Sequence, residues 1–149
     1  MEILRKAANF KASVSDLKLI YTSFIRSVVE QSSNVWNCSL TQQNIDDLER
    51  IQRTALKIIL RQKYKNYDNA LKIMDLETLK DRRDLLNLKF AKLSVNNEKM
   101  KDYFQPKIKF HTMKTRSGDK YEVYKANGER YKNSPIIHMQ RILNEHHNQ

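Results

Sequence analysis

Residues that interrupt helices are scarce in this sequence. Its 149 residues include only two glycines, Gly118 and Gly128, and two prolines, Pro106 and Pro135. Glycine and proline are the residues least compatible with a helix interior. Hydrophobic residues make up 40% of the chain, which is enough for a core. The sequence therefore predicts long helices packed around one interior, in a chain whose length suits one compact domain or a small domain with a tail.

Apolar residues recur at steps of three and four over several segments, the spacing of one helix face. A Ser, Thr or Asp stands where a helix N-cap would be in three of these segments. The predicted helices are Leu17–Val29 behind Ser13 or Ser15, Thr41–Leu60, a short helix from Asp68 to Met74, and a longer one from about Glu77 to Val95. This pattern predicts a mainly α-helical fold, a small bundle of three to four helices over residues 1–105.

The sequence changes character after residue 105. Lys120–Ala126 alternates in the manner of a β-strand, with Tyr121 and Val123 on one side. Ser134 followed by Pro135 is a favoured helix start. We expect residues 106–149 to form an irregular, partly strand-like C-terminal extension with a short strand and a terminal helix.

Several bulky or reactive side chains are expected to lie in the core. The wide apolar face of the helix behind Ser13 includes Tyr21, Phe24 and Val28. Val35 and Trp36 are expected to pack into the core near the end of this helix. The last long helix has a stripe of Leu79, Leu86, Phe90 and Leu93 that contains Arg83, so Arg83 is expected to be buried and Arg82 to face outward. Cys38, the one cysteine, is expected to be a small buried hydrophobe because nothing near it would activate a thiol.

The chain carries 28 Lys and Arg against 17 Asp and Glu, a formal charge of +11. A field of this sign favours polyanionic partners such as RNA or DNA, although it also simply confers solubility. No apolar run is long enough to span a membrane, and Met1–Phe10 lacks the pattern of a secretory signal. We expect an intracellular protein of the nucleus or cytoplasm, with no membrane partner.

The segment from Thr41 to Lys65 is the strongest indication of a partner. Four cations fall on a narrow strip of the predicted helix and two more follow it: Arg50, Arg53, Lys57, Arg61, Lys63 and Lys65. No acidic residue lies between Glu49 and Asp68, and Tyr64 and Tyr67 alternate with the last cations. Cations beside aromatic rings suit phosphate contact and base stacking. The alternative interpretation is an ordinary solvated helix face.

Residues for catalysis or for a metal ion are not apparent. Asp46 and Asp47 lie at a helix start, where they complement the helix dipole, and lack the flanking apolar strands of a polymerase metal turn. The four histidines and one cysteine do not have zinc-ligand spacing. We expect no enzyme activity, no cofactor and no resident metal.

An ordered series of motifs extends through most of the chain. It comprises L-x-Y-x-S-F-I-R-S-V at Leu19–Val28, Val35-Trp36, L-E-R-I-Q-R-T-A-L-K-I-I at Leu48–Ile59, Asp81-Arg82-Arg83, Lys89–Lys92 and Ser134–Asn144. In this order the motifs resemble the region that follows the polymerase palm in reverse transcriptases of jockey-like retrotransposons, which lack long terminal repeats. One departure is Gln31, where such proteins often carry an aromatic residue.

The resemblance implies a thumb-like, C-terminal part of an RNA-directed DNA polymerase that contacts a template–primer duplex or element RNA. It also implies that the chain begins downstream of the catalytic palm, so no catalytic position can be transferred to it. The expected function is non-catalytic nucleic-acid binding, with RNA or DNA left open. The alternatives are a protein-interaction module that packs on a palm domain and an inert remnant of a decayed element.

Overall fold

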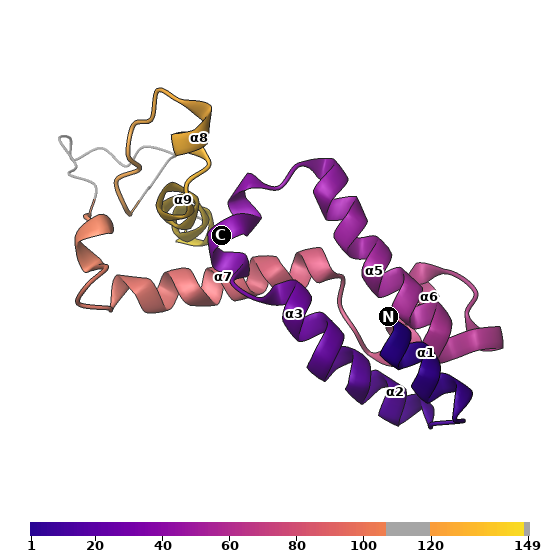
Figure 1. Cartoon of the computed structure of the whole chain (residues 1–149). Coiled ribbons are helices and arrows are strands. Elements are labelled where there is room, and N and C mark those ends of the chain that lie inside the picture. Colours follow the sequence, from indigo (N-terminus) through magenta and orange to yellow (C-terminus); the bar gives the residue numbers. More distant parts are fainter. Residues whose placement is uncertain (107–119, 148–149) are drawn as a thin grey trace. The chain divides into compact units, whose positions relative to one another are not determined.

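A computed structural model describes residues 1–106 and 120–147. The chain divides into two compact units, Met1–Gln31 with Leu40–Arg82, and Ser32–Ser39 with Arg83–Gln149. The prediction of a mainly helical fold is confirmed (Figure 1). The predicted division at residue 105 differs from the boundaries of these units. None of the helices in the described part of the chain is long and apolar enough to cross a bilayer.

Unit 1 is built from helices that lie side by side in Figure 1: α1 against α2 and α5, and α5 against α6. Its elements are α1 (Glu2–Asn9), α2 (Val14–Ile20), the π-helical turn η1 (Tyr21–Arg26), α3 (Ser27–Glu30), α5 (Gln42–Leu60), the 3-10 turn η3 (Arg61–Lys63), α6 (Tyr67–Met74) and the first turn of α7 (Leu79–Val95). Its core holds Leu4, Leu17, Tyr21, Leu56 and Ala70.

The predicted caps at the start of α2 and α5 are confirmed. The Ser13 hydroxyl accepts from the Asp16 backbone N–H at 3.1 Å, and the Asp16 carboxylate accepts in return from the Ser13 N–H, a capping box. The Thr41 hydroxyl accepts from the Asn44 N–H at 3.3 Å. The predicted cap at Asp68 is wrong. Asn66 caps α6 instead, because its side-chain oxygen accepts from the Asn69 N–H at 2.8 Å.

The apolar face predicted behind Ser13 is only partly buried. Leu17 and Tyr21 lie in the core, whereas Phe24 is 65% exposed and Val28 is 69% exposed. The predicted face is wider than the strip of helix that α1 and α5 cover. The π-helical turn between Tyr21 and Arg26 also breaks the 3.6-residue period on which the prediction was based.

Unit 2 contains α4 (Ser33–Trp36), the 3-10 turns Asn37–Ser39 and Lys101–Tyr103, the rest of α7, α8 (Glu129–Lys132) and α9 (Pro135–His147). Its apolar core joins Ala91, Phe104, Met139 and Leu143. The terminal helix begins at Pro135 as predicted.

The predicted stripe on α7 is only partly buried: Leu79 lies in the interior and Leu86 is half-buried. Leu93 is 71% exposed and Phe90 is 36% exposed, while the buried side of the helix carries Arg83, Asn87, Ala91 and Ser94. This buried face has no apolar periodicity, because three of its four residues are polar. The buried position of Arg83 is confirmed, because the residue is 0% exposed.

Arg83 is held by neighbours from the segment Ser32–Ser39. Its Nε donates to the Asn37 side-chain oxygen at 3.1 Å, and its guanidinium carbon lies 6.0 Å from the centre of the Trp36 ring. Trp36 and Cys38 are half-buried, and Val35 is 64% exposed, so the prediction that Val35 fills the core is wrong. Arg82, in unit 1, does not simply face outward: its Nε lies 2.7 Å from the Glu30 carboxylate.

The strand predicted over Lys120–Ala126 is reduced to a single antiparallel bridge between Pro106 and Tyr121. Two buried amides of α9 bind the backbone that a neighbouring strand would otherwise pair with. Asn144 accepts from the Tyr121 N–H at 2.9 Å and donates to the Tyr121 carbonyl at 3.0 Å, and Gln140 accepts from the Tyr124 N–H at 3.2 Å. Side chains of α9 therefore take the place of strand pairing at Tyr121 and Tyr124, while the Glu122 N–H donates to the Gln105 carbonyl at 3.0 Å.

The stability of unit 2 is expected to depend on pH through His138 on α9. Burial lowers the pKa of its imidazole; Arg141 acts in the same direction, while the carboxylates of Asp84 and Glu145 oppose it. The unfolded chain therefore binds this proton more readily, so stability is lost as pH falls through the ordinary histidine range of about 6.5 toward 5. Thermal unfolding measured across that range should show this loss, and His138→Gln should flatten it. An unchanged pH dependence in the variant would contradict the assignment.

Candidate nucleic-acid interface

Helix α5 positions most of the predicted cations, and its bounds agree with the prediction. Its buried side consists of Gln52, Ala55, Leu56, Ile59 and Leu60. The predicted apolar side is therefore displaced: Ala55 and Ile59 are buried, but Leu48, Ile51 and Ile58 are only half-buried. The helix ends at Arg61, whose backbone has a φ of 49°, and the chain turns there into η3.

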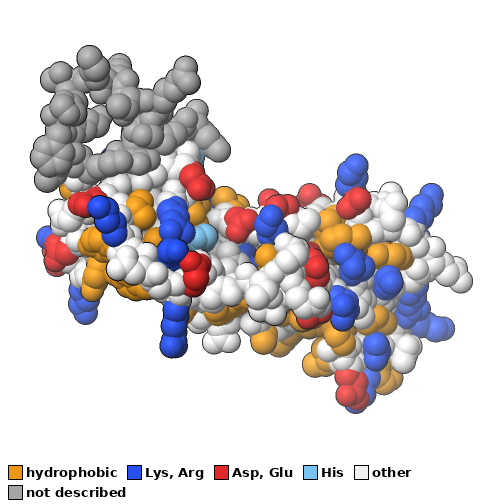
Figure 2. Space-filling view, turned by 90° about the horizontal axis from the view of Figure 1, so that it is seen from above, with side chains coloured by type: hydrophobic (Ala, Val, Ile, Leu, Met, Phe, Trp, Pro, Cys, Tyr) orange, Lys and Arg blue, Asp and Glu red, His pale blue; other side chains and the backbone are white. Residues whose placement is uncertain are grey.

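The six predicted cations are all exposed. We call them the basic ridge: Arg50, Arg53, Lys57, Arg61, Lys63 and Lys65. On the face of unit 1 visible at the right of Figure 2, blue Lys and Arg side chains predominate over red Asp and Glu side chains. Arg50, Arg53 and Lys57 lie on α5, whose other side packs in the core of the unit, whereas Arg61 and Lys63 lie in η3 and Lys65 follows it.

Two members of the ridge have partners within the unit. Arg50 lies 3.3 Å from the carboxylate of Asp47. The pair is exposed and one helix turn apart, so it contributes little to the stability of the fold. The Arg61 guanidinium donates to the carbonyl of Ala8 in the last turn of α1, where helix carbonyls lack helical partners. Arg61 therefore connects the end of α1 to the end of α5.

The other four members, Arg53, Lys57, Lys63 and Lys65, form no ion pair with any residue of 1–106 or 120–147. We call these four the open cations. Because they are exposed and no carboxylate of the described residues neutralises them, they remain available to an anion in solution.

The two predicted tyrosines are half-buried, and cations of α5 cover one face of each ring. The Arg53 guanidinium carbon lies 5.1 Å from the centre of the Tyr67 ring, and the Lys57 ammonium lies 5.6 Å from that of Tyr64. The Tyr67 hydroxyl also donates to the Glu49 carboxylate. These contacts hold the side chains of Arg53 and Lys57 in place. Base stacking on the two rings stays a prediction.

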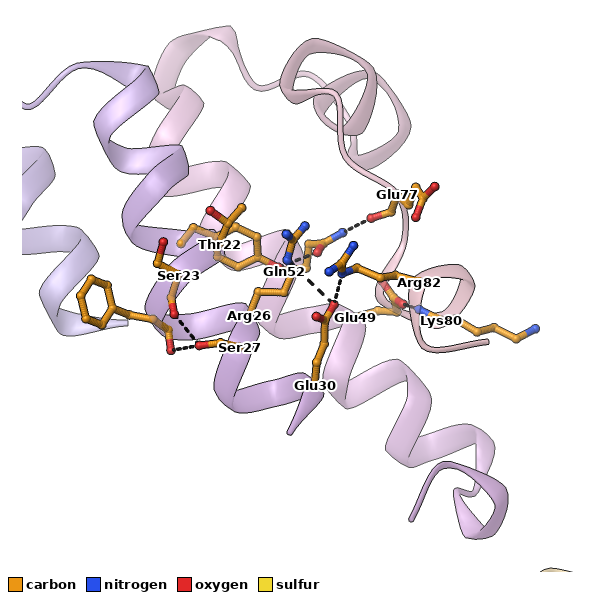
Figure 3. Close-up of polar contacts among 12 residues, drawn as sticks. Thr22, Ser23, Arg26, Ser27, Glu30, Glu49, Gln52, Glu77, Lys80 and Arg82 are labelled. Carbon is orange, nitrogen blue, oxygen red and sulfur yellow. Dashed lines mark hydrogen bonds and ion pairs between the residues drawn. The ribbon is translucent and has the colours of Figure 1, made fainter. Parts of the chain in front are cut away.

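Beneath the ridge lies a buried polar network that the sequence did not reveal. Gln52, at 0% exposure, accepts from the Tyr21 hydroxyl at 2.5 Å and donates to the Glu77 carbonyl at 2.8 Å and to the Tyr67 hydroxyl at 3.1 Å. Figure 3 shows the contact between Gln52 and Glu77. The signal was present in the spacing: Gln52 stands three, four, seven and eight residues before Ala55, Leu56, Ile59 and Leu60.

The phenols of this network remain protonated donors. Burial raises the pKa of Tyr21 well above its ordinary value, and burial together with the bond to Glu49 does the same for Tyr67. The Glu49 carboxylate also accepts from the Lys80 backbone N–H at 2.7 Å, and Glu30 lies between Arg26 and Arg82, both shown in Figure 3. The network joins α5 to η1, α6 and the start of α7.

Asp46 and Asp47, considered above for metal binding, are exposed and accept from the side chains of Gln42 and Gln43. Among the residues that the structure describes, no three His, Cys, Asp or Glu side chains are grouped in a way that could hold a metal ion. What the described geometry presents is a cationic surface.

No protein-family model, curated protein or solved structure was found to match the chain.

Proposed function

We propose that this chain binds nucleic acid through the basic ridge without catalysing a reaction on it, and that it derives from the thumb-like region of a retrotransposon reverse transcriptase. The observation that carries the binding proposal is the set of four open cations on and after a packed helix. The ordered motifs from Leu19 to Asn144 support the proposed origin.

Nucleic acid fits this surface because its charge is regularly spaced along a strand. A basic helix of an ordinary solvated surface commonly carries acidic residues four positions away, which pair with its cations. Glu49 stands four residues before Arg53, but its carboxylate accepts from the Tyr67 hydroxyl and the Lys80 N–H, and from Arg50 to Tyr67 the sequence has no acidic residue. A phosphate backbone can therefore meet Arg53, Lys57, Lys63 and Lys65 without displacing ion pairs.

Binding through four phosphate contacts predicts a steep dependence on salt. Each contact releases condensed counterions from the strand, so affinity for a single strand should fall about fiftyfold between about 50 and 200 mM salt. Fluorescence anisotropy with a labelled RNA strand, titrated at several salt concentrations, measures the slope. A flat response would show that the open cations do not contact phosphates.

A second candidate function rests on exposed apolar residues of unit 1. Leu19, Phe24 and Val28 lie along α2, η1 and α3 and are 64%, 65% and 69% exposed. Neighbouring exposed apolar side chains can mark a protein interface. A module that packs on a polymerase palm would use such a face, and its binding would not require the basic ridge.

A further inference from the structure

A groove of about 490 Å³ lies within unit 1 where α5 ends and the chain turns from α1 into α2. Its apolar wall includes Val14 and Leu17 of α2 and Ile59 of α5. Its other side carries Arg61, Gln62 and Lys63, which continue from the helix that holds the ridge. The groove therefore adjoins the C-terminal end of the basic ridge.

The composition of the groove indicates the chemistry of its occupant. The residues that line it include Lys63, one of the open cations, and no Asp or Glu. The volume falls in the range of ligand sites in proteins, which are typically apolar with a few polar groups that orient the ligand. An occupant should therefore be partly apolar and attached to negative charge.

An unpaired nucleobase has these properties. Its faces are apolar enough to lie against Val14 and Ala12, its edge offers hydrogen bonds to the exposed amide of Gln62, and its own phosphates bring charge toward Lys63. A cation covers one face of the Tyr64 ring and one face of the Tyr67 ring, which leaves less of each ring open to a base. Val14 at the groove is 44% exposed, so a base can contact its side chain.

We propose that this groove receives an unpaired base of a single strand while the flanking phosphates lie on Lys63 and the neighbouring open cations. The inference rests on the proposed function and makes it more specific. A base within a duplex is stacked and paired, so it cannot enter the groove without being extruded at a cost of a few kcal/mol. The chain should therefore prefer single strands to duplexes.

The test uses three probes of about 16 nucleotides, within the site sizes of single-strand-binding proteins: a mixed-sequence RNA strand, its duplex, and the same strand with abasic sites. The unaltered chain should bind the intact strand about tenfold more tightly than either other probe, because one seated base contributes roughly that factor. The abasic strand keeps every phosphate, so this comparison isolates the base and requires no substitution in the protein.

A pair of substitutions locates the effect. Val14→Asp places a carboxylate in the groove at the first residue of α2, where the helix dipole favours negative charge. It should weaken binding of the intact strand about tenfold, to the level of the duplex. Val28→Asp makes the same change at a valine that is 69% exposed and does not line the groove, and it should leave the preference for the intact strand unchanged.

Three outcomes overturn the inference. Equal affinity for intact and abasic strands would mean that only phosphates are bound, and the proposed function would stand without the groove. Equal effects of the two valine substitutions would place the base elsewhere. Binding of an acidic amphipathic peptide in preference to all three probes would assign the groove to a protein partner. Absence of binding to every probe would instead contradict the proposed function itself.

Discussion

Replacing Gln52 by leucine is expected to lower the free energy of unfolding of the chain by about 2–4 kcal/mol, since buried groups left without partners cost about 1–3 kcal/mol each. The substitution removes the acceptor of the buried Tyr21 hydroxyl and the donor to the Glu77 carbonyl. Tyr67 keeps its bond to Glu49, so it contributes less to the loss. Urea unfolding followed by circular dichroism measures the difference.

Gln43→Leu is the matched control for this prediction. It makes the same change on the same helix at an exposed residue, whose amide donates to the exposed Asp47 carboxylate and to no other group of residues 1–106 and 120–147. Its effect should stay within about 0.5 kcal/mol, as for most surface substitutions. If the two variants unfold at the same urea concentration, Gln52 does not organise the interior of unit 1.

The helices were predictable where the local sequence determines them. Ser13 and Thr41 cap α2 and α5 through hydroxyls that the sequence displays, and Pro135 opens α9 because its fixed φ suits a first helical turn. The scarcity of glycine and proline is a property of composition, and it was enough to predict the helical class.

The interior was less predictable because much of it is polar. Gln52, Asn87, Gln140 and Asn144 are buried although their side chains are polar, and the predicted apolar faces did not include them. Each buried amide needs partners from distant segments, and those partners become apparent only after folding. The same reason explains the missing strand, since the buried amides Gln140 and Asn144 bind the backbone of residues 120–124.

The exposure of the basic ridge followed from helical periodicity, because residues at steps of three and four share one side of α5. The sequence could not show that Arg61 binds the Ala8 carbonyl or that Arg53 and Lys57 cover tyrosine rings. These contacts join residues of different segments. The bond from Arg61 to Ala8 and the ion pair of Arg50 with Asp47 leave four of the six predicted cations as the open cations.

Reversing the charge of Arg53 and Lys57 together is expected to weaken RNA binding about a hundredfold at low salt, through two lost phosphate contacts and two new repulsions. Both residues are exposed, so the fold should persist. The lost ring contacts with Tyr67 and Tyr64 should cost about 0.5–1 kcal/mol each. Circular dichroism of the double variant should therefore show unchanged helix content.

The matched control reverses Lys72 and Lys80, which are exposed in the same unit and stand near acidic residues Asp68, Glu77 and Asp81 in the sequence. Each substitution of Lys or Arg by Glu lowers the net charge by two, so both double variants lower the formal charge from +11 to +7. The control should bind RNA within about threefold of the unaltered chain, because only overall charge changes. A module that binds proteins through its exposed apolar face would keep any self-association in both variants.

The most direct test of the basic ridge is the ratio of RNA affinities of these two double variants, measured by anisotropy in one low-salt buffer. Binding through the basic ridge predicts that Arg53→Glu with Lys57→Glu binds at least about thirtyfold more weakly than Lys72→Glu with Lys80→Glu, the quotient of the two expected losses. Equal affinities would contradict it, because binding would then depend on net charge and not on the cations of α5.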